Sequence, residues 1–185
     1  MSDLQVELSQ IDRSDLNSIK QIINSGFGLL LDDGFEFNVT DFTKWYDRIV
    51  LVNKHMFAIR VSKSETGSSS RSWLVGICGV VEVDNASRHG RLIFFMIDKD
   101  GHKSTLQNHP ASRHAFNTLL KYSFKELGLN KVWMSVPSNN DISSVLDSSG
   151  FTADGIRRRS AFINGKYRDE AIFSLTMKEF MEKYK

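Results

Sequence analysis

The chain has 185 residues, of which 41% are apolar and 25% charged, and its formal net charge is +2. This length and composition fit one globular domain over residues 1–185, and so small a charge gives no broad field for nucleic acid or an anionic membrane. Residues 1–30 show no signal-peptide pattern, and no apolar run is long enough to span a bilayer. Cys78 is the single cysteine. We therefore expect a cytoplasmic protein without disulfides.

The N-terminal part of the chain predicts one strand and two helices. Residues 4–11 alternate apolar and polar side chains, as a half-buried strand does. Ser14 and Asp15 can cap the first helix, and Thr40 can cap the second. The apolar side chains of the two helices are Leu16, Ile19, Ile22 and Ile23 in the first and Phe42, Trp45, Tyr46 and Ile49 in the second. We expect these aromatic side chains to belong to the core.

Three further strands are predicted before the middle of the chain. They cover residues 55–62, 73–84 and 90–98, and a flexible hairpin loop of residues 64–72 separates the first two. The last two strands are nearly continuous apolar runs, which indicates burial on both faces.

The central part of the chain combines a long helix with a buried strand. Apolar residues recur at helical spacing over residues 110–127. Pro110 suits the first helical turn, and Gly128 suits the left-handed position after the last. Residues 132–136 then predict a strand buried on both faces and parallel to a neighbour, and residues 138–141 can begin another helix. A loop, a helix N-terminus and a parallel strand end together can bind a phosphate-bearing ligand.

The C-terminal part predicts an antiparallel strand pair and a short helix. The strands cover residues 151–162 and 169–177 around Asn164 and Gly165, with a connection longer than a two-residue hairpin. Residues 179–185 form the helix.

Residues 122–132, with the sequence YSFKELGLNKV, resemble a segment of the GNAT acetyltransferases, in the group that contains the RimJ/RimL enzymes. The resemblance continues in order through Asn139, Gly150–Phe151, residues 155–158 and 164–169, and Phe173–Leu175. It implies an α/β (α+β) GNAT fold, with a mixed, mostly antiparallel sheet of six to seven strands, a splayed parallel pair and about four flanking helices. It also implies acetyl-CoA as the co-substrate.

The family motif R/Q-x-x-G-x-G/A, which holds the CoA pyrophosphate, falls on the sequence QNHPAS of residues 107–112. Pro110 stands in place of the first glycine and removes one amide donor, which weakens binding by about tenfold to a hundredfold unless Ser112, His109 or Arg113 replaces the lost bond. The resemblance places pantetheine between the splayed strands. The expected acetyl-CoA contacts are Phe95, Met96, Ile97, Gln107, Asn108, His109, Pro110, Ala111, Ser112, Arg113 and Asn139.

Acetyl transfer needs a base for the amine proton and a donor for the departing thiolate. Three polar residues that family members use are replaced here by Leu146, Ile142 and Ala161. Among the remaining polar groups expected near the cleft, which are Glu82, Asp84, His89 and Ser135, we select Glu82 and Ser135 as the catalytic candidates. Tyr167 and Asp169 match family positions as a turn-stabilising pair, Cys78 is expected to be buried, and no metal site is expected.

The resulting prediction is an N-acetyltransferase that moves an acetyl group to a primary amine on a small molecule or a peptide. A protein N-terminus, a polyamine, an aminoglycoside and an amino sugar all fit. The alternative is a catalytically impaired relative that serves as an acyl-CoA-binding or regulatory module. We expect no nucleic-acid or membrane partner, and a monomer or a weak homodimer.

Overall fold

The computed structural model describes residues 4–24, 47, 55–63, 72–96, 111–137, 143–163 and 165–185. The strands are β1 (Leu4–Gln10), β2 (Met56–Lys63), β3 (Ser72–Asp84), β4 (His89–Met96), β5 (Lys131–Pro137), β6 (Thr152–Ile163) and β7 (Lys166–Thr176). The helices are the 3₁₀ turn η1 (Arg13–Asp15), α1 (Leu16–Asn24), α3 (Ser112–Lys121), the π-helical turn η3 (Tyr122–Glu126), α4 (Ser143–Ser148) and α5 (Met177–Lys183).

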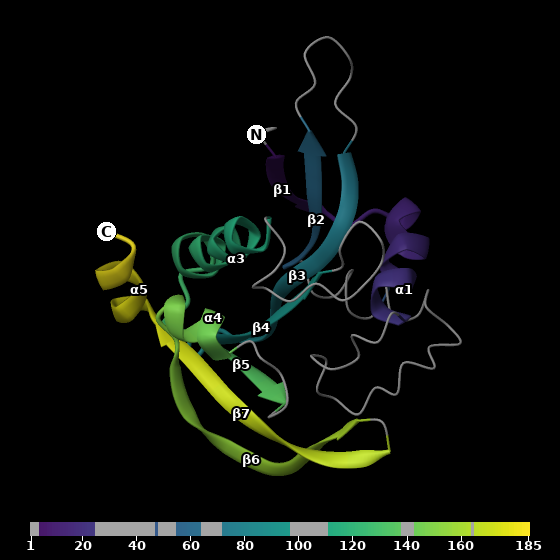
Figure 1. Cartoon of the computed structure of the whole chain (residues 1–185). Coiled ribbons are helices and arrows are strands. Elements are labelled where there is room, and N and C mark those ends of the chain that lie inside the picture. Colours follow the sequence, from purple (N-terminus) through teal and green to yellow (C-terminus); the bar gives the residue numbers. More distant parts are fainter. Residues whose placement is uncertain are drawn as a thin grey trace.

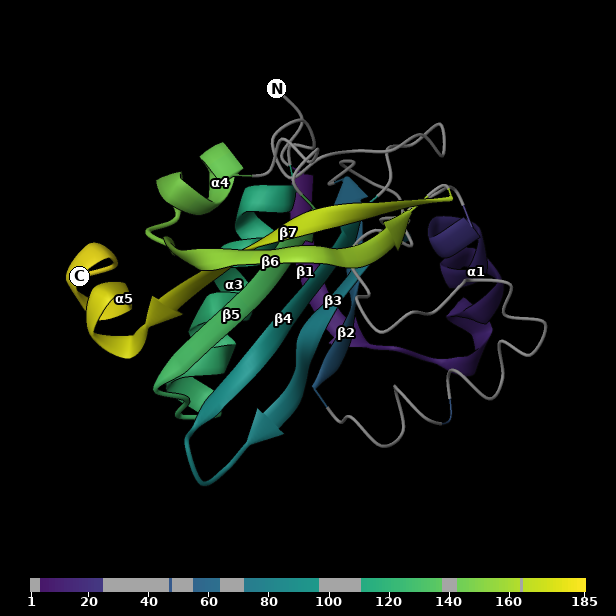
Figure 2. The same cartoon turned by 90° about the horizontal axis from the view of Figure 1, so that it is seen from below.

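The strands form one sheet in the order β1-β2-β3-β4-β5-β7-β6, and only the neighbours β4 and β5 are parallel. This confirms the mixed, mostly antiparallel sheet with one parallel pair. Figure 1 shows α3 and α1 on opposite sides of β2 and β3. Figure 2, seen from below, shows α3 behind β4 and β5. Helices therefore cover both faces of the sheet centre, which explains why its strands are nearly continuous apolar runs.

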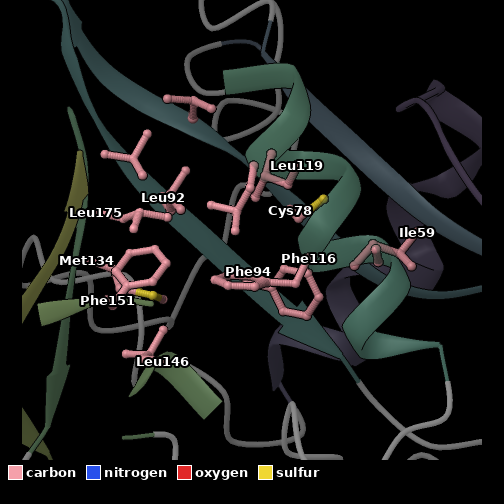
Figure 3. Packing of buried hydrophobic residues seen from close by; sticks show 14 of the residues in the cluster. Ile59, Cys78, Leu92, Phe94, Phe116, Leu119, Met134, Leu146, Phe151 and Leu175 are labelled. Atoms are coloured by element: carbon pink, nitrogen blue, oxygen red, sulfur yellow. The ribbon is translucent and has the colours of Figure 1, made fainter. Parts of the chain in front are cut away.

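The main core lies between α3 and the sheet. Phe94 of β4 packs edge-on against Phe116 of α3, with ring centroids 5.5 Å apart, and Phe116 also lies 5.9 Å from Phe151 (Figure 3). Alternate residues of β4 face the other way, and there Ile93 and Phe95 are 1% exposed outside this cluster. The central strands are thus buried on both faces, as predicted.

The long central helix agrees with its prediction over residues 110–127. It begins at Ser112 and continues through η3 to its C-cap, Leu127. Gly128 follows with φ of +61°, the left-handed conformation that glycine adopts most easily. Pro110 lies outside the described residues.

The first helical segment is capped two residues earlier than predicted. Asp12, and not Ser14, is the N-cap, because its Oδ1 accepts the Ser14 amide at 2.8 Å. Asp15 accepts the Asp12 amide in return at 2.9 Å, which completes a capping box. Asp15 also accepts two hydrogen bonds from Arg60 on β2, at 2.8 and 2.7 Å. Of the helix predicted from Thr40, only Asp47 lies within the described residues.

The closing hairpin is longer and tighter than predicted. Ile163 pairs with Lys166, so only Asn164 and Gly165 connect β6 to β7, and the prediction of a longer loop is wrong. Asn-Gly favours two-residue turns, and Gly165 has the positive φ, +74°, that such turns require. The prediction missed residues 166–168 of β7, because these exposed residues lie beyond the core and show no apolar alternation.

The remaining boundaries differ by a few residues. β3 already begins at Ser72, which pairs with Ser62, while the rest of the predicted loop lies outside the described residues. α5 begins at Met177, because Thr176 is its N-cap and forms a capping box with Glu179.

Candidate active site

The parallel strands β4 and β5 separate partway along their length. They pair through three residues each, and the last pair is Arg91 with Trp133. Beyond it, Leu92–Met96 and Met134–Pro137 form no ladder with each other. We call the paired residues the closed half and the separated residues the open half of the β4–β5 pair. This is the splay that the resemblance implied.

Each strand keeps its other neighbour throughout the open half. Met96 of β4 still pairs with Gly76 of β3, and Pro137 of β5 still pairs with Glu170 of β7. The edges of β4 and β5 that face each other therefore carry backbone donors and acceptors that no strand ladder engages. Phe95 and Met96, predicted to contact pantetheine, lie here, and Ile97 falls just outside the described residues.

The N-terminal half of α3 packs against the open half. Phe116 of α3 contacts Phe94, which belongs to the open half. The N-cap, Ala111, makes no side-chain capping bond, and Ala111 and Ser112 are each 1% exposed whereas Arg113 is exposed. The amides of a first helical turn have no acceptor within the helix and carry partial positive charge, which suits a phosphate. Residues 107–110 and Asn139 lie outside the described residues.

Two of the residues considered for chemistry are core residues. Leu146 of α4 is fully buried beside Phe151 and Met134 and has no polar hydrogen to donate to a thiolate (Figure 3). Cys78 is fully buried, and burial raises the pKa of its thiol, so it is not a nucleophile.

The catalytic candidates Glu82 and Ser135 lie near the start of the splay. Glu82, at a bulge of β3 with φ of +52°, forms an ion pair with the buried Arg91 at 2.8 Å. The Arg91 guanidinium lies 5.8 Å from the Trp133 ring centroid, and Arg157 of β6 lies 5.6 Å from the same centroid. Ser135, two residues after Trp133, is 5% exposed and points away from the α3 core.

Asp84 and His89 lie instead at the turn between β3 and β4. Asp84 Oδ1 accepts the amides of Ala86 and Ser87 at 2.8 and 3.1 Å. These bonds, that of Ser87 first, hold the pKa of Asp84 below its ordinary value. The His89 and Asp84 side chains approach to 3.6 Å at the N-terminal end of β4, which is the end opposite the open half. The structure therefore assigns Asp84 to the turn.

Glu170 is a candidate that the sequence did not reveal. It is 1% exposed, pairs with the last residue of β5, Pro137, and its Oε2 accepts a 2.6 Å hydrogen bond from Ser160. Glu170 lies on the same face of the sheet as its partner Pro137. Because side chains alternate between the two faces of a strand, Ser135, two positions before Pro137, lies on that face too. No sequence signal distinguishes it, because the neighbouring Asp169 is equally acidic.

Asp169 and Tyr167 do not form the expected turn-stabilising pair. Asp169 Oδ1 accepts the backbone amide of Arg159 at 2.8 Å, which stabilises a bulge of β6. The Tyr167 ring lies near the Arg159 guanidinium, at 5.2 Å, and near Phe162, at 5.0 Å.

Within the described ranges, no group of three or more His, Cys, Asp or Glu side chains can hold a metal ion, and no helix is long and apolar enough to cross a membrane.

The splayed parallel pair, with a helix N-terminus beside it, defines an acetyltransferase architecture of the GNAT type. A model of the acetyltransferase (GNAT) domain family matches residues 8–172. The chain belongs to the GNAT acetyltransferase family. It is thus an acyltransferase of the N-acetyltransferase class whose co-substrate is acetyl-CoA.

The solved structures that resemble the chain have the same fold over nearly their whole length. A mutant form of the spermidine/spermine N-acetyltransferase SpeG from Vibrio cholerae has a TM-score of 0.74 at 20% identity, covering 98% of this chain and 99% of that chain. Spermidine N-acetyltransferase from Vibrio cholerae in complex with CoA and spermine has a TM-score of 0.73 at 20% identity, covering 96% and 98%. No curated protein sequence gives a significant match.

Proposed function

We propose that this protein transfers an acetyl group from acetyl-CoA to a primary amine at the open half of the β4–β5 pair. The observation that carries the proposal is the loss of the ladder after Arg91 and Trp133, while both strands keep their outer neighbours. A slot lined by backbone donors and acceptors suits the amide groups of a pantetheine arm. The transfer forms a C–N bond at the acceptor, breaks the thioester C–S bond and releases CoA as a thiol.

The acetyl-CoA contacts follow the same placement. The backbone of residues 95–97 is proposed to bind pantetheine, and residues 107–113 are proposed to bind the pyrophosphate, which suits the first turn of a helix. Of these, Phe95, Met96 and residues 111–113 lie within the described residues. Ser112 and Arg113 replace the amide that Pro110 lacks, and Asn139 binds the pantetheine arm. The contact of Phe94 in the open half with Phe116 in the second turn of α3 supports this proposal.

The acceptor must lose a proton before its nitrogen can attack. Ser135 and Glu82, the two candidates from the sequence, are joined by Glu170, which is buried near the end of β5. Glu82 already forms an ion pair with Arg91, so its carboxylate is less available to the acceptor amine. We therefore rank Glu170 and Ser135 before Glu82 as groups that accept the proton, directly or through a water.

The acceptor is a primary amine, on a peptide as in RimJ/RimL enzymes or on a small molecule as in the SpeG enzymes. The CoA and spermine complex of SpeG supports an amine acceptor in this fold. We retain the RimJ/RimL group as the proposed subgroup because the sequence segment of residues 122–132 carries that resemblance.

Acetyl-CoA titration tests the proposed site. At about a hundred times its dissociation constant, acetyl-CoA should raise the free energy of unfolding by about 2.7 kcal/mol. Backbone amide exchange should slow in Phe94–Met96 and Met134–Val136, while β2 serves as the internal control. Arg113→Ala should weaken binding about tenfold if its side chain replaces one charge-assisted bond. Absence of both stabilisation and protection at millimolar acetyl-CoA would remove the proposed site.

An amine panel followed by release of free CoA thiol tests the reaction. The panel contains spermidine, an aminoglycoside, an amino sugar and peptides with a free N-terminus. Glu170→Gln and Ser135→Ala should lower kcat and leave the acetyl-CoA dissociation constant nearly unchanged, because the open half is proposed to bind pantetheine through its backbone, which neither substitution alters. If acetyl-CoA binds but no amine releases the thiol, the alternative of a binding module replaces the proposed function.

A further inference from the structure

The backbone ladder between β4 and β5 ends at two large side chains, Arg91 and Trp133. Leu92 and Val132, their neighbours along the strands, belong to the main core between α3 and the sheet, so both side chains lie on the opposite face of the sheet. The Arg91 guanidinium is 5.8 Å from the centroid of the Trp133 ring, a distance at which a cation is attracted to an aromatic ring. The last backbone pair thus coincides with a side-chain contact between the two strands.

Strands on both sides of the β4–β5 pair take part in this contact. Glu82 of β3 forms an ion pair with Arg91 at 2.8 Å, and the Arg157 guanidinium of β6 lies 5.6 Å from the centroid of the Trp133 ring. We call Glu82, Arg91, Trp133 and Arg157 the fork cluster. Its contacts link β3, β4, β5 and β6 at the place where β4 and β5 separate.

Arg91 is the one charged residue among the buried residues of β4. Its side chain is 5% exposed, whereas that of its partner Glu82 is 47% exposed. A buried charge needs such a partner, but apolar side chains of similar volume often replace a buried ion pair without loss of stability. The stability of the sheet alone therefore does not require a charge at this position. What distinguishes the position from the rest of β4 is that the ladder with β5 ends there.

The backbone at Glu82 is strained. Its φ of +52° lies in the left-handed region, which glycine adopts most easily. Glu82 belongs to a bulge, because β3 has one residue more than β4 between its pairs with Arg91 and His89. Glycine would adopt this conformation with less strain, but it would lack the carboxylate that pairs with Arg91. Strain of this kind, beside the separation of β4 and β5, suggests a functional role for the contact.

We propose that Arg91 is a positioning residue for acetyl transfer, which fixes the place where β4 and β5 separate through its contacts with Trp133 and Glu82. This inference rests on the proposed function, because the open half beyond the fork cluster is the proposed pantetheine slot. If the separation moved along the strands, other backbone groups would be left for pantetheine. Ser135, a catalytic candidate, would move as well, because it lies two residues after Trp133 on the same face.

Arg91→Lys tests the proposal with two ligands. Lysine keeps the charge but lacks the planar guanidinium that pairs and stacks. We expect the acetyl-CoA dissociation constant to rise about tenfold, the value of one bond to pantetheine, and kcat to fall about tenfold because Ser135 is displaced. The dissociation constant of adenosine 3′-phosphate 5′-diphosphate, which is the nucleotide part of CoA without pantetheine, should not change. An equal loss of affinity for both ligands, or no loss for acetyl-CoA, would overturn the proposal.

Gly90→Ala is the matched control for Arg91→Lys. It disturbs β4 one residue before the fork cluster, where the added methyl group would lie 2.6 Å from Cγ1 of Val80. This control should lose stability and leave both dissociation constants unchanged, because the contacts of Arg91 with Trp133 and Glu82 remain. The same rise in the acetyl-CoA dissociation constant in Gly90→Ala would show that any disturbance of the paired strands weakens binding, which contradicts a specific role for Arg91.

Two substitutions of Glu82 separate positioning from stability. Both Glu82→Gly and Glu82→Ala remove the carboxylate that pairs with Arg91, but glycine relieves the positive φ and alanine keeps it. Glu82→Gly should therefore resist urea better than Glu82→Ala, while both raise the acetyl-CoA dissociation constant by the same factor, about threefold to tenfold. A change in affinity that follows stability would reduce Arg91 to a structural role. A fall in kcat with unchanged affinity would make Glu82 a catalytic group, and either result overturns the proposal.

Backbone amide exchange without ligand separates this inference from the proposed function. In unliganded Arg91→Lys, the amides that bond across the β4–β5 ladder should exchange about tenfold faster than in the unmodified protein, because the ladder opens from its end, while β2 stays unchanged. This result does not depend on acetyl-CoA, so it reports on the fork cluster even if no acetyl transfer occurs. Unchanged exchange across the ladder would overturn the inference and leave the proposed function intact.

Discussion

The closed and open halves of the β4–β5 pair differ in composition, since His89, Arg91 and Lys131 lie in the closed half and the open half is nearly all apolar, and they are held together differently. In the closed half, Gly90 of β4 is tightly enclosed, because a Cβ atom there would lie 2.6 Å from Cγ1 of Val80 on β3 and 3.2 Å from Cδ1 of Leu129, which precedes β5. The carbonyl of Arg88, just before β4, accepts the amide of Lys131 at 3.2 Å. The closed half thus depends on backbone bonds and on the small volume of one residue.

In the open half, the strands have no ladder between them and depend on their outer neighbours and on α3. Phe94 packs against Phe116, and the ladders of β4 with β3 and of β5 with β7 continue to Met96 and Pro137. A parallel pair can therefore lose its ladder without losing its core. The backbone of the open half is then available to a ligand. Two of the predictions below ask whether ligand binding belongs to this half alone, and the third concerns a charged contact that holds the closed half.

The largest effect is expected in the open half, from Phe94→Ala. Removing a ring that is 2% exposed leaves a cavity against Phe116, and the free energy of unfolding should fall by about 3–5 kcal/mol, measured by urea denaturation. The affinity for acetyl-CoA should fall as well, because Phe94 supports the strand that faces pantetheine. Phe162→Ala, near the exposed end of β6, is the control and should cost less than about 0.5 kcal/mol. An acetyl-CoA dissociation constant unchanged in folded Phe94→Ala would show that the open half does not hold the ligand.

In the closed half, Gly90→Ala should reduce stability without affecting ligand binding. The added methyl group must displace Val80, which is fully buried, so we expect a loss of about 1–3 kcal/mol from overpacking. The acetyl-CoA dissociation constant of the folded variant, measured by calorimetry, should equal that of the unmodified protein. A large loss of affinity would erase the distinction between the halves.

The smallest effect concerns the ion pair that ties the closed half to β6. Lys131 Nζ and Asp154 Oδ2 are 2.8 Å apart, and this hydrogen bond is the main reason why the pKa of Asp154 lies below its ordinary 3.8. A lowered folded-state pKa stabilises the protein above pH 3.8 and loses its effect as the pH falls through the folded value. Because both side chains are more than a third exposed, Asp154→Asn should cost less than about 1 kcal/mol at pH 7.

The control for this prediction is the same comparison of the two proteins at acid pH. The difference in unfolding free energy between the unmodified protein and Asp154→Asn should be largest near neutral pH and should disappear in acid. Asparagine can still accept the hydrogen bond that Ser174 Oγ donates at 2.8 Å, so that contact does not contribute to the difference. A cost that persists unchanged at pH 3 would mean that packing, and not charge, links Asp154 to β5.

Much of the fold followed from local patterns in the sequence. The apolar spacing of residues 110–127 and the position of Gly128 predicted the long helix and its left-handed end, and both are observed. The continuous apolar runs predicted central strands buried on both faces and a parallel neighbour for residues 132–136. Prediction was less successful at the closing hairpin, where Lys166 begins a strand that no apolar alternation reveals.

The sequence by itself determined the helices and strands, because their periodicities report which side chains must be buried. The resemblance to GNAT motifs indicated how these helices and strands combine in one fold. Only the tertiary structure decided where β4 and β5 separate, since apolar side chains report that the faces of a strand are buried and not whether its backbone edge is paired. It also decided that Glu170 is buried while Arg158 and Arg168, on the same β6–β7 hairpin, are exposed. These outcomes depend on register and on which strand lies alongside, and those are properties of the whole sheet.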